Sequence, residues 1–209
     1  PQKTGNGRAE LKKYDIILAD CPWTFNTYSP KGKEHKSAEL HYTCMDINDI
    51  YNLNVNSIAS DNCVLFMWVT SPMLQEGLET IKRWGFDYKT IAFNWVKRNK
   101  KADSWFWGLG YWTRQNSELC LLATKGRPKR VSKGVLQPFD TENPFVFYDT
   151  ETITERIMRH SQKPNIVSDK IVELMGDLPR VELFARNTLQ GWDSIGYEVD
   201  GKDIMKVLN

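Results

Sequence analysis

The sequence of 209 residues predicts an α/β fold with a mostly parallel sheet. Short apolar runs of the kind that form buried strands alternate along the chain with segments whose apolar residues recur at helical spacing. With 41% hydrophobic and 26% charged residues, the composition is that of an ordinary globular protein. No run approaches the roughly 20 apolar residues of a membrane span. We therefore expect a single domain over residues 14–209, preceded by a flexible leader over residues 1–13.

The first predicted strand ends at an acidic residue. An apolar run that begins at Tyr14 stops at Asp20, and Pro22 and Trp23 follow at once. In open α/β sheets, ligands bind at the carboxyl ends of strands, so Asp20 is expected where chemistry takes place. The alternative is that Asp20 only starts a turn and takes no part in chemistry. The next segment, residues 26–43, has no apolar period and predicts a long loop.

The middle of the chain predicts two helices and three strands. Asp46 is suited to cap a short helix that follows it. Ser71 and Pro72 provide the N-cap and the first position of a second helix, which Gly85 ends. The strands are expected over residues 64–69, 88–96 and 118–124, with a basic, aromatic loop over residues 97–113.

The last third of the chain begins with an irregular segment, residues 127–149, which contains three prolines. Two helices are expected after it, one within residues 151–160 and one over residues 165–175. Residues 181–185 form a last strong strand pattern, and a Gly-containing tail follows it. The alternation of strands and helices is what favours the parallel sheet.

Positive charge is concentrated in the central third of the chain. Residues 82–133 contain thirteen Lys or Arg against three Asp or Glu, although the whole chain has a net charge of only +2. Four tryptophans, at positions 95, 105, 107 and 112, lie among these cations. Phosphates need cations and unstacked bases need rings, so this segment favours a nucleic-acid surface over the plainer interpretation of a solvated charged face.

The cysteines and histidines do not predict a metal site. Four cysteines are far apart in the sequence and form no C-x-x-C pair, and three histidines lack the spacing of metal ligands. Cys63 and Cys120 lie in apolar runs and are expected to be buried thiols. Free thiols of this kind indicate a reducing, intracellular compartment.

Asp20 and the residue after it suit chemistry on an exocyclic amine. The lone pair of a nucleobase amine is delocalised into the ring, and acceptors that take hydrogen bonds from the amine help it to pyramidalise. Asp20 offers one acceptor, and the backbone carbonyl of Cys21, held by Pro22, offers a second. Trp23 or a neighbouring ring offers a surface for the base. Positioning and electrostatics would then do most of the catalytic work.

The tetrapeptide Asp20-Cys21-Pro22-Trp23 is similar to the D-P-P-W motif of amino-methyltransferases, and further motifs follow in a consistent order. They extend the likeness from about Tyr14 to Gly201. Together they resemble the MT-A70 family of adenine-N6 methyltransferases, which use S-adenosylmethionine. The matching pieces include 40–42, 65–70, 84–86, 94–97, 110–114, 118–120, 125–126, 160–164, 182–186 and 191–193.

This resemblance implies a Rossmann-like methyltransferase fold, with helices on both faces of the sheet and a permuted motif order. The catalytic motif comes first, and the main cofactor strand lies near the C-terminus. The resemblance assigns catalysis to Asp20, Cys21, Pro22 and Trp23. It assigns S-adenosylmethionine binding to Asp20, Lys163, Phe184, Arg186, Asn187, Thr188, Tyr197 and Glu198, with Tyr197 departing from the usual Asn.

The resemblance also suggests where a nucleic acid binds. Tyr42, Trp68, Trp95 and Glu118 are expected near the target base. Taken alone, the two tryptophans lie in strand patterns and are more often core residues. The basic segment is expected to supply backbone contacts from Lys97, Arg98, Lys100, Lys101 and Arg114.

Three functions follow from these observations. Small bacterial and phage members of the family act mainly on DNA, so the first is adenine-N6 methylation of DNA in the cytoplasm or nucleoid of a bacterium or phage-infected cell. RNA is the close alternative, because the 2′-OH has no visible sequence signature. The third is a non-catalytic subunit that binds nucleic acid beside an active partner; Cys21 and Tyr197 favour it, and the retained Asp20, Lys163 and Arg186 oppose it. A homodimer or a heterodimer with a related subunit is also expected.

Overall fold

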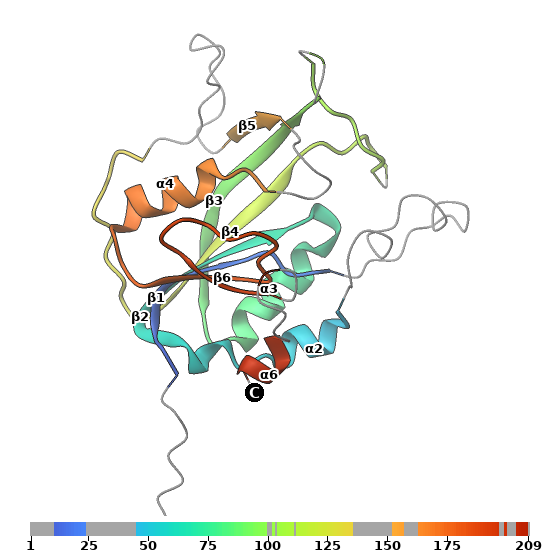
Figure 1. The fold of residues 1–209 in the computed structure, drawn as a ribbon. Helices are drawn as coiled ribbons and strands as arrows, with labels where there is room; N and C mark the ends of the chain where they lie inside the picture. Colours follow the sequence, from blue (N-terminus) through green and yellow to red (C-terminus); the bar gives the residue numbers. More distant parts are fainter. Residues whose placement is uncertain are drawn as a thin grey trace, which may run out of the picture.

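Seven strands form one sheet, in the order β5-β3-β4-β2-β1-β6-β7 (Figure 1). The computed structural model describes residues 11–23, 45–99, 102, 104–110, 112–135, 163–196, 199 and 204–208, and the backbone of 152–156. The strands are β1 (Tyr14–Ala19), β2 (Ala59–Val69), β3 (Asp87–Arg98), β4 (Glu118–Lys125), β5 (Thr152–Arg156), β6 (Arg180–Leu183) and β7 (Asp193–Ile195). The helices are α2 (Ile47–Asn52), α3 (Leu74–Arg83), α4 (Ile166–Met175) and α6 (Ile204–Leu208), with single turns η2 (Val55–Ser57) and η3 (Ser71–Met73).

The sheet is mixed but mostly parallel, which confirms the predicted fold class. β1 lies at its centre and pairs in parallel with β2 on one side and β6 on the other. β3 with β5 and β6 with β7 are also parallel pairs. Among the strands of the described residues, β4 alone runs the other way, between β2 and β3. As a result, β4 begins at the edge of the sheet where β1 and β2 end.

Helices cover both faces of the sheet, as predicted. Along β1, Ile17 and Ala19 point into the core under α2, α3 and α6, whereas Ile16 and Leu18 point into the core under α4. This alternation is the ordinary period of two in a strand. Because both faces are covered, the central strands are apolar along almost their whole length.

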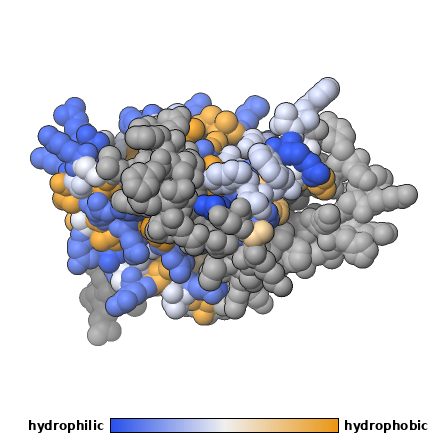
Figure 2. Space-filling view, turned by 90° about the horizontal axis from the view of Figure 1, so that it is seen from above, coloured by the Kyte–Doolittle hydropathy of each residue, from blue (hydrophilic) through white to orange (hydrophobic). Residues whose placement is uncertain are grey.

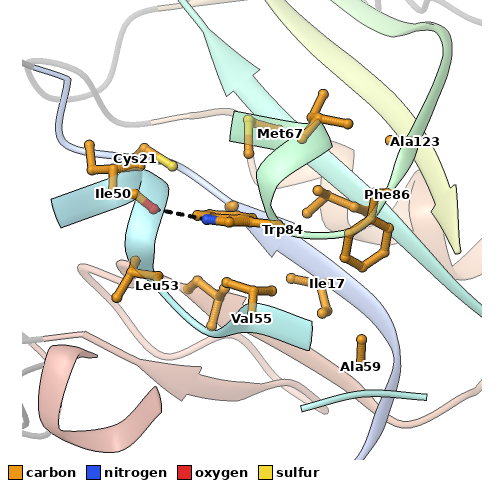
Figure 3. Close-up of a cluster of buried hydrophobic side chains, with 14 of the residues drawn as sticks. Ile17, Cys21, Ile50, Leu53, Val55, Ala59, Met67, Trp84, Phe86 and Ala123 are labelled. Carbon is orange, nitrogen blue, oxygen red and sulfur yellow. Dashed lines mark hydrogen bonds between the residues drawn. The ribbon is translucent and has the colours of Figure 1, made fainter. Parts of the chain in front are cut away.

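The core on the α2–α3 side is organised around Trp84 (Figure 3). Its indole nitrogen donates a hydrogen bond of 2.9 Å to the carbonyl of Ile50, which joins the end of α3 to α2. Gly85 follows with a φ of 83°, and its amide bonds to Lys82 while the amide of Phe86 bonds to Ile81. These two bonds are the Schellman motif, so Gly85 ends α3 as predicted.

Most predicted elements occur in the structure, with three differences. Ser71 was expected to be the N-cap before Pro72, but the N-cap of η3 is Thr70. Ser71 is instead the first residue of this turn. A helix was expected within residues 151–160, but residues 152–156 form β5, because pairing with the edge of β3 overrides local preference. The short strand β7 lies in the predicted tail. Among the described residues, no helix is long and apolar enough to cross a membrane.

Candidate active site

The site lies where β1 and β6 end side by side. The chain leaves β1 for β2 in one direction and leaves β6 for β7 in the other, so the gap between these strands is a topological switch point. The amide of Asp20 points to the carbonyl of Leu183 at 3.5 Å, which brings the first strong strand against the last. Ligand sites in open α/β sheets form at this kind of position.

A tight turn at the end of β1 holds the Asp20-Cys21-Pro22-Trp23 motif in place. The amide of Trp23 donates to the carbonyl of Cys21 at 2.8 Å, across the single residue Pro22. This is the pattern of a γ-turn, and the fixed φ of proline suits its central position. The Cys21 carbonyl has two lone pairs, and within the described part of the chain the Trp23 amide is the donor that uses one of them.

The side chains of Cys21 and Trp23 lie in the core and anchor this turn. Cys21 is 3% exposed and packs among the residues around Trp84 (Figure 3), and burial raises the pKa of its thiol well above the ordinary value. Trp23 is 4% exposed in the same core, and its indole nitrogen donates to the carbonyl of Trp68. The ring of Trp23 therefore secures the turn from the opposite face of the sheet and is not exposed beside Asp20.

Asp20 points to the other face, where four charged side chains form an alternating chain. Lys163 donates to both carboxylate oxygens of Asp20, at 2.8 and 2.9 Å. The same ammonium lies 3.2 Å from Oε2 of Glu118. Lys97 contacts the second oxygen, Oε1, at 2.5 Å. Two ammonium groups and two carboxylates thus alternate in a mostly buried row, which we call the charge network.

Secondary structure explains why these residues meet. α4 leads through a short turn into β6, so the start of α4 lies at the carboxyl end of β6, and Lys163 comes just before it. Glu118 is the first residue of β4 and shares the α4 side of the sheet with Cys120. Lys97 extends from β3, which pairs with β4 at Glu118. All three elements therefore place a charge at the same edge.

Two tryptophans form the floor beneath the charge network. Trp68 and Trp95 are each 1% exposed and meet edge to face, with ring centroids 6.5 Å apart. The ammonium of Lys163 lies 5.7 Å from the Trp68 ring, and that of Lys97 lies 5.0 Å from the Trp95 ring. Rings at these distances stabilise cations that have lost part of their water. Both tryptophans are core residues whose upper surfaces face the charges.

Burial and pairing act in opposite directions on the ionisable groups. Burial raises the pKa of Asp20, and Lys163 offsets only part of that rise. Burial would also raise the pKa of Glu118, but Lys163 and Lys97 outweigh it and hold that pKa below its usual value. The two carboxylates in turn raise the pKa of Lys163 despite its burial. The network therefore keeps Lys163 and Glu118 charged and leaves Asp20 with an elevated affinity for a proton.

The end of β6 places the residues expected to bind the cofactor. Phe184 has a φ of 60°, a strained conformation for a bulky residue, and turns the chain sharply beside Asp20. Arg186, two residues further on, favours the ionised form of Asp20. Asn187 and Thr188 are exposed. Tyr197 and Glu198 lie outside the described residues.

The groups around Asp20 fit S-adenosylmethionine by their chemistry. Lys163 and Arg186 have the N–H groups that would donate to its carboxylate, and the half-buried Glu182 has the oxygens that would accept from its ammonium or ribose hydroxyl groups. At the neighbouring end of β2, the hydroxyl of Thr70 is buried and has no hydrogen-bond partner in the structure among the described residues. A buried polar atom of this kind is usually satisfied by a ligand or a water molecule.

The basic residues expected to contact nucleic acid separate into different environments. Lys97 belongs to the charge network, whereas Arg114 is exposed, and Arg98 lies 5.2 Å over the ring of Trp105. Lys100 and Lys101 lie outside the described residues, as does Tyr42 among the residues expected near the base. Arg98 and Arg114 thus extend the site outward from β3 and the start of β4.

The loop between β3 and β4 carries exposed rings. Trp107 is 58% exposed and Trp112 is fully exposed. The loop backbone is held by Asn116, whose side chain bonds to the backbone of Lys97 and to the carbonyl of Phe106. On the face drawn in Figure 2, hydrophobic residues are scattered among hydrophilic ones. Asn116 therefore holds the loop backbone next to Trp107, and Trp112 lies further along the same loop.

Sequence reasoning did not single out Glu182 as a site residue. It pairs with Leu18 on β1 and is next to Asp20 in the sheet. Burial, together with the charge of Asp20, raises the pKa of Glu182 from 4.5 to about 7. The signal in the sequence was that Glu182 is a charged residue within the otherwise apolar run 181–185.

Comparison with known proteins agrees with this geometry. The MT-A70 family model matches residues 14–198, nearly the whole chain. The chain belongs to the MT-A70 family. This family of adenine-N6 methyltransferases acts on nucleic acids, and the Rossmann-like fold and the position of β1 beside β6 are those expected of it.

Two relatives show the range of this family. The chain is 31% identical to the type II methyltransferase M.MunI of a Mycoplasma species, over 92% of this chain and 81% of that protein. It is 26% identical to the human N(6)-adenosine-methyltransferase catalytic subunit METTL3, over 91% of this chain but only 29% of that protein. The chain spans less than a third of METTL3.

Glu182 gives the folded protein a pH dependence that can be measured. Because the folded state holds this proton up to about pH 7 and an ordinary Glu releases it near 4.5, raising the pH through that window removes stability. We expect Glu182→Gln to abolish this loss, so that the variant gains on the order of 1–3 kcal/mol relative to wild type between pH 4.5 and 8. Urea unfolding across this range measures it, with Glu173→Gln on exposed α4 surface as the control. A parallel pH dependence in wild type and Glu182→Gln would contradict the assignment.

Proposed function

We propose that this chain transfers a methyl group from S-adenosylmethionine to the N6 amine of adenine in DNA. The observation that carries the proposal is the pair of acceptors at the end of β1. The carboxylate of Asp20 and the second lone pair of the Cys21 carbonyl are adjacent in the chain, and the γ-turn at Pro22 fixes the carbonyl. An amine has two N–H groups, so two acceptors match it in number.

The two acceptors would orient the amine for reaction. When both N–H groups donate to protein oxygens, the nitrogen lone pair is directed away from them and loses conjugation with the ring. S-adenosylmethionine supplies an electrophilic methyl group on a sulfonium. As the N–C bond forms and the C–S bond breaks, the nitrogen gains positive charge, which the Asp20 carboxylate stabilises. The nitrogen then loses one proton, and Asp20 is suited to accept it because burial raises its pKa.

Lys163 has a double role in this account. Its ammonium neutralises Asp20 and holds both carboxylate oxygens, which fixes the direction in which their remaining lone pairs point. Glu118 offers an alternative partner 3.2 Å from the same ammonium. Lys163 can therefore shift toward Glu118 when the amine arrives, without losing a counter-charge. With Arg186, Asn187 and Thr188, it would also donate to the cofactor.

The target adenine would enter above the charge network, which covers Trp68 and Trp95, with Tyr42 proposed to contact it. Taking a base out of a duplex costs a few kcal/mol, and stacking on a ring returns roughly 1–3 kcal/mol per base. Arg98 and Arg114, with Lys100 and Lys101, would hold the backbone of the same strand. Their charges supply affinity that does not depend on sequence.

The share of each relative's length that this chain matches favours DNA over RNA as the substrate. The chain matches the type II methyltransferase M.MunI over 81% of that protein's length, whereas its match to METTL3 spans 29%. The second candidate, a non-catalytic subunit, would need neither the intact Asp20 nor its pairing with Lys163. Burying these charges costs desolvation free energy even when they are paired. A non-catalytic subunit would have no need for such a buried network.

The test of substrate is direct. We expect N6-methyladenine to appear in duplex DNA when the protein is incubated with labelled S-adenosylmethionine, with mass spectrometry of the digested product as the measurement. Single-stranded DNA and RNA of the same sequence are the comparison substrates. Label in RNA alone would select the RNA alternative. Nucleic-acid binding with no label in any substrate would select the non-catalytic subunit.

Replacement of Asp20 tests the mechanism. We expect Asp20→Ala to lower the rate of methyl transfer at least about 100-fold, because the variant cannot stabilise the charge on the amine. Calorimetry should show that the cofactor still binds, since Lys163 and the end of β6 are retained. Asp49→Asn, on the exposed first turn of α2, is the matched loss of a carboxylate and should keep full activity. Transfer by Asp20→Ala at more than a tenth of the wild-type rate would exclude the proposed role.

Replacement of Cys21 separates its carbonyl from its thiol. The thiol packs in the core around Trp84, so Cys21→Ala should lower the free energy of unfolding by about 1–2 kcal/mol. It should leave the turnover number within about threefold of wild type, because the carbonyl and the γ-turn remain. Chemical denaturation and a turnover assay measure the two effects. Loss of turnover in a stably folded Cys21→Ala would instead assign chemistry to the sulfur.

A further inference from the structure

Lys97 was expected on the nucleic-acid surface, but its contacts lie within the protein. Its ammonium reaches Oε1 of Glu118 and lies 5.0 Å from the ring of Trp95, and the side chain is 17% exposed. Its backbone is held as well, because the side-chain amide of Asn116 accepts from the Lys97 amide and donates to its carbonyl. A phosphate contact needs a cation that is free to reach solvent, and this cation is already paired.

The charge network depends on this outer lysine. With Lys97 present, two positive and two negative charges alternate and sum to zero. Without it, Asp20 and Glu118 would share the single charge of Lys163. The Glu118 side chain is 9% exposed, and its Oε1 would lose its partner in a site that water hardly reaches. A buried carboxylate in that position either takes up a proton or draws the remaining ammonium toward itself.

Both outcomes would reach Asp20. If Glu118 took up a proton, Lys163 would keep one full partner and bind Asp20 more strongly, which weakens its acceptance of the amine. If Glu118 drew Lys163 away, Asp20 would lose the contacts of 2.8 and 2.9 Å that hold its oxygens in place. Lys97 therefore influences Asp20 from the far end of the network, through Glu118 and Lys163.

We propose that Lys97 is a positioning residue for methyl transfer, which keeps Glu118 ionised and oriented so that Lys163 remains shared between Glu118 and Asp20. The inference rests on the proposed methyl transfer at Asp20. The groups that face Glu118 are Lys97 from β3 and Lys163 from the segment before α4, with Asp20 of β1 on the far side of Lys163. Lys97 touches neither the amine nor the methyl donor in this arrangement.

Three variants test the role. Lys97→Met keeps the aliphatic stem over Trp95 but removes the charge, and Lys97→Arg restores it. Lys89→Met is the matched control, because Lys89 lies on the same strand, is half exposed and lies 3.9 Å from Asp87. Turnover number and KM for duplex DNA are measured against salt concentration. The carboxyl group of Glu118 is titrated by NMR on protein labelled with ¹³C-glutamate, and Glu118→Gln assigns its signal.

We expect Lys97→Met to lower the turnover number about tenfold or more and leave the salt dependence of KM unchanged. Glu118 should then titrate at a pH about one unit higher or more, since one of its two cations is gone. Lys97→Arg should recover most of the turnover, and Lys89→Met should behave as wild type.

A phosphate contact would give a different pattern. Lys97→Met would then raise KM with the turnover number intact, and the slope of log KM against log salt would fall by about one. That pattern, or a Glu118 titration unaltered in Lys97→Met, would overturn the proposal. Absence of methyl transfer in the wild-type protein would overturn the proposed function alone, and the Glu118 titration, which needs no activity, would still decide the role of Lys97.

Discussion

Lys163 reaches Asp20 from 143 residues further along the chain, and the candidate site depends on this ion pair. Several features must hold for it to form. β6 must pair with β1, α4 must pack on the face of the sheet to which Asp20 points, and Glu118 must start its strand at the same edge. Removing one partner from a buried pair of this kind commonly costs 3–5 kcal/mol. The site thus depends on the whole sheet, although a four-residue motif is enough to locate it in the sequence.

The Asp20-Cys21-Pro22-Trp23 motif is explained by the division of its residues between two faces. Asp20 continues the face of Leu18 and meets the charge network, whereas Cys21 and Trp23 pack in the opposite core. Pro22 holds the turn in which the Trp23 amide uses one of the two lone pairs of the Cys21 carbonyl. Under the proposed function only the acid and the carbonyl would contact a substrate, whereas the sulfur and the indole serve as anchors in the core. This explains how a cysteine can stand where the related motif has a proline.

Much of the fold could be predicted from the sequence, because apolar runs and caps report local structure. The four strong strands over residues 14–20, 64–69, 88–96 and 118–124, the Asp46 cap and the stop at Gly85 depend on nearby residues. β5 could not be predicted, since an edge pairing decides it. The same holds for the site. Asp20 could be identified because it ends a predicted strand. The contact of Lys97 with Glu118 and the burial of Trp23 could not, because they depend on strands that meet only in the folded sheet.

We propose that Asp20 and the Cys21 carbonyl together hold the amine of an adenine. A crystal structure of the protein with an adenine-containing DNA oligonucleotide and a non-reactive analogue of S-adenosylmethionine tests it most directly. We expect the N6 nitrogen within about 3.2 Å of both an Asp20 carboxylate oxygen and the Cys21 carbonyl oxygen. We also expect Lys163 in contact with Asp20 or Glu118. An adenine amine bound away from Asp20, with Lys163 still bonded to both carboxylate oxygens of Asp20, would contradict this proposal.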